Sequence, residues 1–110
     1  MIRCITLFFL LISTSVLGSV TTASKVVTEI RIQRYQGDAY YYFTAIGNDW
    51  LAPGCQKAKY AYIKESDAGS QAILSIVLTA KATQTPVIFT GTCGDINGNL
   101  GYMQITDIRI

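Results

Sequence analysis

The 110-residue chain contains no histidine, and this absence excludes several kinds of site. A Ser-His-Asp triad or a Cys-His pair needs an imidazole as general base, so neither can form within the chain. No glycine-rich phosphate loop occurs, and no two carboxylates can be placed together as in a glycosidase. The sequence therefore predicts a protein that is not an enzyme and that binds no cofactor.

Metal ligands are equally scarce. Two cysteines outside the N-terminal segment do not complete a zinc shell without histidine. Residues 95–99 (DINGN) resemble the opening of a calcium loop, but the twelfth position of such a loop is Thr106 here, where an EF-hand needs glutamate. We therefore predict a tight Asn-Gly turn over these residues and no metal site.

Charged residues are few, at 15% of the chain, with nine lysines and arginines against seven acidic residues. A sequence-independent nucleic-acid binder needs clustered basic side chains to neutralise phosphates, and the sequence has no such run. No internal repeat or low-complexity linker divides the chain. The sequence predicts one domain that does not bind nucleic acid.

Hydrophobic residues make up half of the chain, and they are concentrated at its start. Residues 4–18 follow a lone basic residue, Arg3, and are too few to span a bilayer as a helix, which takes about 20 residues. This pattern is typical of a secretory signal peptide, the alternative being an uncleaved anchor. Cleavage fits after Gly18 or after Ala23, and we predict the second. The resulting expectation is a signal peptide at 1–23 and a secreted or periplasmic domain at 24–110, with no membrane span after cleavage.

The cysteines support this expectation. Cys4 would leave with the signal peptide, which makes Cys55 and Cys93 the one possible intrachain pair. In an exported protein such a pair is expected to form a disulfide. A domain of this size hides only about 60 to 65% of the surface of its unfolded chain, so a covalent link is a useful source of stability.

Alternating hydrophobicity predicts five strands, at residues 25–35, 39–46, 59–64, 86–92 and 102–110. Apolar residues at helical spacing predict a helix over residues 67–83, with Ser66 as its N-cap and Pro86 behind its end. The turn signal at 36–38 makes the first two strands a hairpin. A mainly β chain in the order β-β-β-α-β-β matches the OB-fold, so we predict an OB-fold-like small barrel.

Aromatic residues are the most unusual feature of the predicted second strand (AYYYFTAI). Tyr40 and Tyr42 face one way, whereas Tyr41 and Phe43 face the other, so one pair fills the barrel and the other points outward. Outward rings beside polar groups could bind sugars, could lie in a subunit interface, or could simply belong to the core. The candidate glycan-binding residues are Tyr40, Tyr41, Tyr42, Asn48, Asp49, Trp50 and Lys59.

Two stretches resemble the B subunits of bacterial AB5 toxins, especially the pertussis-like and subtilase-cytotoxin-like ones. Residues 39–43 are similar to an aromatic strand that contributes to a sialic-acid pocket there. Residues 71–89 run, as in that family, from a helix through a short polar turn into a Val/Ile strand. This chain is shorter than those subunits, and its cysteine spacing does not match theirs, so we carry over only Tyr40 to Tyr42 as glycan contacts.

The resemblance implies a secreted, non-catalytic subunit that binds cell-surface glycans and forms a homopentamer. Such a ring would deliver a catalytic A subunit, and its interfaces would be heterologous. The alternative is a monomeric exported OB-fold module of the cell envelope that binds a small ligand or a protein. A small exported enzyme or enzyme inhibitor is a third possibility, and the fold alone does not choose among them.

Overall fold

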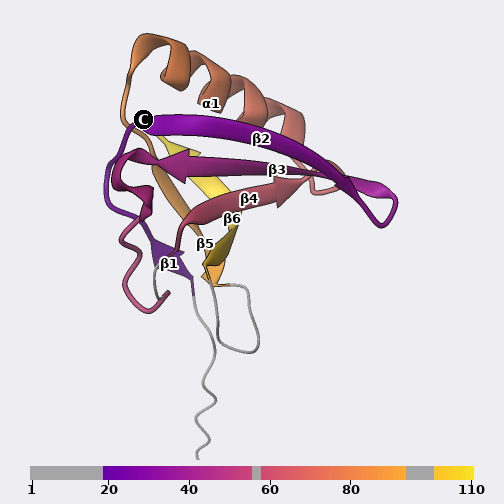
Figure 1. Cartoon of the computed structure of the whole chain (residues 1–110), viewed down its shortest axis with the longest axis horizontal. Helices are drawn as coiled ribbons and strands as arrows, with labels where there is room; N and C mark the ends of the chain where they lie inside the picture. Colours follow the sequence, from indigo (N-terminus) through magenta and orange to yellow (C-terminus); the bar gives the residue numbers. More distant parts are fainter. Residues whose placement is uncertain (1–18, 56–57, 94–100) are drawn as a thin grey trace, which may run out of the picture.

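A computed structural model describes residues 19–55, 58–93 and 101–110 (Figure 1). The expected turn over residues 95–99 lies outside these ranges. The predicted mainly β chain with one helix is confirmed. Its elements are β1 (Val20–Thr21), β2 (Val27–Tyr35), β3 (Asp38–Ala45), the 3₁₀ turn η1 (Ile46–Asn48), β4 (Tyr60–Lys64), α1 (Ser70–Thr83), β5 (Ile88–Cys93) and β6 (Tyr102–Arg109). Within the described ranges, no helix is both long and apolar enough to cross a membrane.

The strands form a single sheet in the order β1-β5-β6-β4-β3-β2. All neighbours are antiparallel except β4 and β6, which are parallel. The sheet is curled but not closed. The edge strands are β1 and β2. In the segment that connects them, the backbone of Lys25 pairs with that of Val87, the residue before β5. The result is a small barrel-like fold with α1 packed against it (Figure 1).

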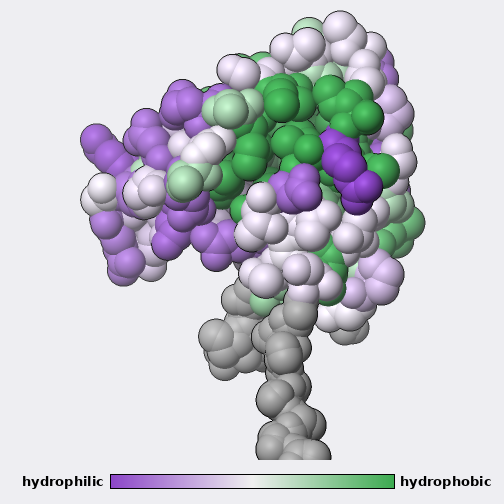
Figure 2. Space-filling view, turned by 180° about the vertical axis from the view of Figure 1, so that it is seen from behind, coloured by the Kyte–Doolittle hydropathy of each residue, from purple (hydrophilic) through white to green (hydrophobic). Residues whose placement is uncertain are grey.

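The β2–β3 hairpin is set by its two-residue turn. Gln36 and Gly37 have φ of 52° and 79°, which is the left-handed geometry of a type I′ turn. Tyr35 and Asp38 flank this turn and pair directly. Seen from behind, the hairpin projects from the body as a hydrophilic arm, whereas hydrophobic side chains gather below α1 (Figure 2).

The core lies on the inner face of the sheet, beneath α1. Trp50 is fully buried, and its indole N–H donates to the carbonyl of Phe43 at 3.0 Å. The Phe89 ring stacks on Phe43 and meets Trp50 edge-on, with centroids 5.7 and 4.9 Å apart. Helix α1 contributes Val77 and Ala80 to this cluster. Phe43 therefore settles the orientation of β3, because its neighbours Tyr42 and Thr44 must point away from it.

Strands β5 and β6 approach each other closely at Gly91. A Cβ atom on this residue would lie 2.0 Å from the carbonyl oxygen of Gln104, inside any tolerable contact. The pairing of β5 with β6 also shifts register between Thr90 and Gly91. Thr106 is the extra residue of this β-bulge, and the close approach of the two strands requires glycine at position 91.

The helix begins at Ser70, three residues later than predicted, with Gly69 as its N-cap at φ 81°. Ser66 is therefore not the cap. Its hydroxyl is engaged elsewhere, because it donates to Oδ2 of Asp38 at 2.6 Å, across from the start of β3. The buried hydroxyl of Ser70 instead donates to the carbonyl of Glu65 at 2.8 Å. The predicted end is confirmed at Thr83, followed by Gln84 at φ 59°.

The hydrogen bond from Ser66 gives a testable pH effect. It is the main reason that the pKa of Asp38 lies below 3.8, and the backbone N–H of Ala39 acts in the same direction. Because the pKa is lower in the fold than in the unfolded chain, ionised Asp38 stabilises the fold at neutral pH, and this contribution fades as the pH falls through the folded pKa. We expect Ser66→Ala to raise the pKa of Asp38 in an NMR titration. Ser75→Ala, on the exposed side of α1, should leave it unchanged, and equal values in both variants would contradict the assignment.

The predicted disulfide is confirmed. Cys55 and Cys93 are bonded, with their Cα atoms 5.3 Å apart. The bond joins the loop that follows η1 to the end of β5, two segments separated by 38 positions in the chain. The bond therefore connects a segment that precedes α1 in the chain with a strand that follows it.

Residues 20–23 form part of the fold. Val20 and Thr21 pair with β5, and the buried Thr22 accepts a hydrogen bond at its hydroxyl from the Phe89 N–H at 3.0 Å. Cleavage after Ala23 would remove all of these contacts, whereas cleavage after Gly18 would keep them. We therefore expect an exported chain to begin at Ser19. Intact mass measurement of the protein recovered from the export compartment tests this, and a mass corresponding to a start at Ser24 would contradict it.

Candidate functional site

The outer face of the sheet carries a cluster of six tyrosines, which we call the tyrosine face. It arises from alternation along β3, β4 and β6, whose register places Tyr42 opposite Tyr62 and Tyr60 opposite Tyr102. Strand β2 adds one ring at its end. The members are Tyr35, Tyr40, Tyr42, Tyr60, Tyr62 and Tyr102.

The rings form one continuous aromatic surface centred on Tyr42. Its ring centroid lies 5.6 to 6.1 Å from those of four neighbours, which are Tyr40, Tyr60, Tyr62 and Tyr102. The central rings are partly buried, whereas Tyr102 is 44% exposed and Tyr35 is 51% exposed. Each ring is held by its neighbours and still presents part of its surface to solvent.

Three cations lie over these rings. The guanidinium of Arg31 is 5.7 Å from the centroid of Tyr42, and the ammonium groups of Lys59 and Lys64 are 5.3 and 5.8 Å from Tyr60 and Tyr40. Such contacts are favourable because the ring face is electron-rich. They place positively charged hydrogen-bond donors around the aromatic surface.

The central phenol is held in its neutral form. Burial, followed by the neighbouring hydroxyls of Tyr102 and Tyr40, raises the pKa of Tyr42 above 10, against the opposing charge of Arg31. Its hydroxyl donates to the side-chain oxygen of Gln33 at 3.0 Å. At neutral pH the centre of the tyrosine face therefore carries no phenolate, and the hydroxyl of Tyr42 keeps the proton that it donates to Gln33.

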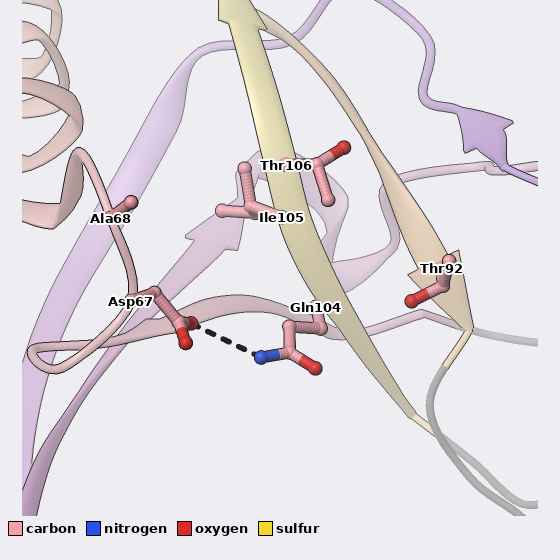
Figure 3. A pocket seen from close by; sticks show the side chains of 6 residues that line it. All are labelled: Asp67, Ala68, Thr92, Gln104, Ile105 and Thr106. Atoms are coloured by element: carbon pink, nitrogen blue, oxygen red, sulfur yellow. Dashed lines mark hydrogen bonds between the residues drawn. The ribbon is translucent and has the colours of Figure 1, made fainter.

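A hollow of about 370 Å³ lies beside the tyrosine face. Figure 3 shows the side chains that line it. Asp67 and Gln104 meet in its lining, where the amide of Gln104 donates to Oδ2 of Asp67 at 3.1 Å. The backbone N–H of Lys64 donates to the same oxygen at 3.0 Å and fixes the carboxylate. Because Gln104 lies opposite Tyr62 on the sheet, the hollow continues the aromatic surface. Its lining residues are Asp67, Ala68, Thr92, Gln104, Ile105 and Thr106.

The structure brings together three of the predicted glycan-binding residues: Tyr40, Tyr42 and Lys59. Tyr41 and Trp50, at 4% and 0% exposure, belong to the core instead. They cannot offer a ring to a ligand, because their side chains point beneath the sheet. The hydroxyl of Tyr41 accepts a hydrogen bond from Gln71 of α1 at 3.0 Å.

The remaining two candidates, Asn48 and Asp49, lie in the turn after β3. Asp49 accepts a hydrogen bond from the backbone N–H of Leu51 at 2.8 Å, so its carboxylate shapes the loop. Among the contacts of the described residues, none joins the side chain of Asn48 or Asp49 to a tyrosine ring. The two residues are therefore outside the site proposed below.

Sequence reasoning missed Tyr102, Gln104 and Asp67 as site residues. Tyr102 and Gln104 share one phase of β6, which was a usable signal for a common face. Their position next to the tyrosines was not visible, because it depends on the parallel pairing of β6 with β4. Asp67 was expected inside the helix, whereas it lies in the turn before it.

The chain matches no known protein family, and no curated protein is significantly similar to it. The resemblance to AB5 B subunits therefore stays a prediction based on residues 39–43 and 71–89. In the part of the chain that the structure describes, no three histidine, cysteine, aspartate or glutamate side chains gather so that they could hold a metal ion. What the geometry offers is an aromatic platform with hydrogen-bonding groups at its border.

Proposed function

We propose that this protein is an exported, non-catalytic glycan-binding module with an OB-fold-like barrel, and that the tyrosine face is its binding site. The fold part of the proposal rests on strand order. Leaving the short β1 aside, the order β2-β3-β4-β6-β5, with β4 and β6 parallel and α1 before β5, is that of the OB-fold. OB-folds bind oligosaccharides and oligonucleotides on the face of their second and third strands, which are β3 and β4 here.

The observation that carries the proposal is the continuity of the tyrosine face with the hollow. The C–H face of a sugar ring can stack on exposed tyrosines, and its hydroxyls need both donors and acceptors nearby. Gln104 and Asp67 supply these at one border, and Arg31, Lys59 and Lys64 supply donors around the rings. An apolar surface with a few fixed polar groups is the usual form of a small-molecule site.

Export is proposed from the predicted signal peptide, and the disulfide between Cys55 and Cys93 supports it, since such bonds persist in oxidising compartments. Homopentamer formation and delivery of a catalytic A subunit remain predictions from the resemblance alone. An adjacent gene for an exported ADP-ribosyltransferase-like or protease-like chain would support the second of these.

The binding site is tested with Tyr102→Ala. The exported protein is first screened on a glycan array, and the best glycan is then titrated by calorimetry. We expect the variant to lose about 10- to 100-fold in affinity, because losing one stacking contact costs roughly 1.4 to 3 kcal/mol. Leu78→Ala, at an equally exposed position on α1, is the matched control and should bind like the parent chain.

Three results would overturn the proposal. They are a folded chain that binds no glycan, a glycan whose affinity is unchanged in Tyr102→Ala, and tighter binding of single-stranded DNA than of any glycan. Circular dichroism of each variant shows that the loss is not due to unfolding.

A further inference from the structure

The tyrosine face carries three positive charges that the described part of the chain leaves without an ion pair. Arg31 and Lys59 are exposed and Lys64 is half-buried, and each charged group lies over a different ring, 5.3 to 5.8 Å from its centroid. Among the described residues, no carboxylate forms an ion pair with any of the three. Lys64 acts on Asp38 only as the smallest of the causes that lower the pKa of that carboxyl. The three cations can therefore bind an anion from outside.

The fold gathers these cations from separate strands, although the sequence has no basic run. Arg31 lies on β2, opposite Tyr42. Lys64 ends β4, opposite Tyr40 on the other side of β3, and Lys59 comes immediately before β4. Strand spacing puts β2 and β4 about 10 Å apart, and the rise of a strand puts the two ends of β4 about 16 Å apart. The charges are therefore spread around the rings and do not converge on one point.

This spread matches one kind of sugar. A sugar ring that lies flat on the tyrosines directs its substituents sideways, toward the surrounding cations. An anionic substituent there forms charge-assisted hydrogen bonds, which are stronger than those of a hydroxyl. A single anionic group reaches only part of the set, whereas a chain with an anionic group on each repeat can contact all three cations.

Two carboxylates at the borders of the face favour a sugar chain over a nucleic acid. Asp67 accepts a hydrogen bond from Gln104 at 3.1 Å, and Glu29 accepts one from the hydroxyl of Thr44 at 3.4 Å. Both would repel an uninterrupted row of phosphates. An acidic polysaccharide presents hydroxyl groups between its charges, and these can donate to the two carboxylates.

We propose that the ligand is an acidic polysaccharide with sulfate or carboxylate groups at regular intervals, an inference that rests on the tyrosine face being a glycan site. The sugar rings stack on the tyrosines, and the anionic groups contact Arg31, Lys59 and Lys64. Because these cations lie at the surface, salt weakens the attraction.

Calorimetry with dextran, dextran sulfate and hyaluronan of equal chain length tests the charge requirement. Dextran is neutral, dextran sulfate carries sulfates and hyaluronan carries carboxylates. At low salt we expect at least one of the two polyanions to bind about tenfold or more tightly than dextran, and the tighter one identifies the anionic group. About 0.5 M NaCl should remove most of this difference. Lactose with a single sulfate should bind more weakly than the polyanion.

Variants then test the three cations. Arg31→Gln, Lys59→Gln and Lys64→Gln each keep an N–H donor and lose the charge, so each should raise the Kd of the tighter polyanion about three- to tenfold. Each should leave the affinity for a neutral glycan unchanged. Arg34→Gln is the matched control, because this exposed side chain alternates to the opposite face of β2.

Four results would overturn the proposal. They are equal binding of dextran and both polyanions, glutamine variants that all keep the parent affinity, a loss in Arg34→Gln as large as in Arg31→Gln, and sulfated lactose that binds as tightly as the polyanion. Circular dichroism excludes misfolding. A neutral glycan that still needs Tyr102 would keep the proposed function while this inference failed, whereas a chain that binds neither neutral nor acidic glycans would overturn both.

Discussion

Replacing Trp50 with alanine is expected to lower the free energy of unfolding by about 3 to 5 kcal/mol. The indole is fully buried, meets Phe89 edge-on at 4.9 Å and donates to the carbonyl of Phe43. Truncation would therefore leave a cavity in the core and remove a buried hydrogen bond at once. Urea denaturation followed by circular dichroism measures the change.

Trp50→Phe separates the two contributions. It keeps most of the ring volume and loses the N–H donor, so we expect a cost of about 1 to 3 kcal/mol, smaller than that of alanine. Any loss of glycan binding in either variant should track the fraction of unfolded protein. A Trp50→Ala chain that stayed as stable as the parent and yet lost the glycan would instead make Trp50 a ligand contact.

Removing the disulfide is the second change with a large expected effect. We expect Cys55→Ala combined with Cys93→Ala to cost about 3 to 4 kcal/mol, because a loop of nearly 40 residues regains its freedom in the unfolded chain. Thermal unfolding of parent and variant, each with and without reductant, measures this cost. Reductant should lower the Tm of the parent and leave that of the variant unchanged.

Cys4→Ser is the control for this experiment. If Cys4 leaves with the signal peptide, the exported Cys4→Ser protein will be identical to the parent in mass and in Tm. An unchanged Tm in the Cys55 and Cys93 variant would show that the bond adds nothing to stability. The hydrophobic core beneath α1 would then account for the stability of the fold.

The local parts of this fold could be predicted because local sequence determines them. The Gln36–Gly37 turn, the alternation along β3 and the apolar stripe of α1 each depend on neighbours in the chain. One short feature could not be found in this way. Strand β1 has only two residues, which lie inside the segment predicted as signal peptide, and its partner β5 lies about 70 positions away.

The main uncertainty in the candidate site was which side chains of β3 face the core. Tyr40 and Tyr42 differ from Tyr41 and Phe43 too little in hydrophobicity for the sequence to show which pair is buried. Trp50 was misplaced for a related reason, because a loop rich in glycine, asparagine and aspartate normally lies at the surface. Here the indole N–H finds a backbone acceptor in the core, which only the assembled sheet provides.

The parallel pairing of β4 with β6 has a consequence for how the protein folds. These strands are separated in the chain by α1 and β5, and β1 likewise waits for β5. Two of the five strand pairings therefore join segments that are far apart in the chain, and they make folding slower and dependent on late parts of the chain. A polypeptide emerging from an export channel would remain unfolded until β6 had crossed. The tyrosine face, which needs Tyr102 on that strand, would be the last surface to form.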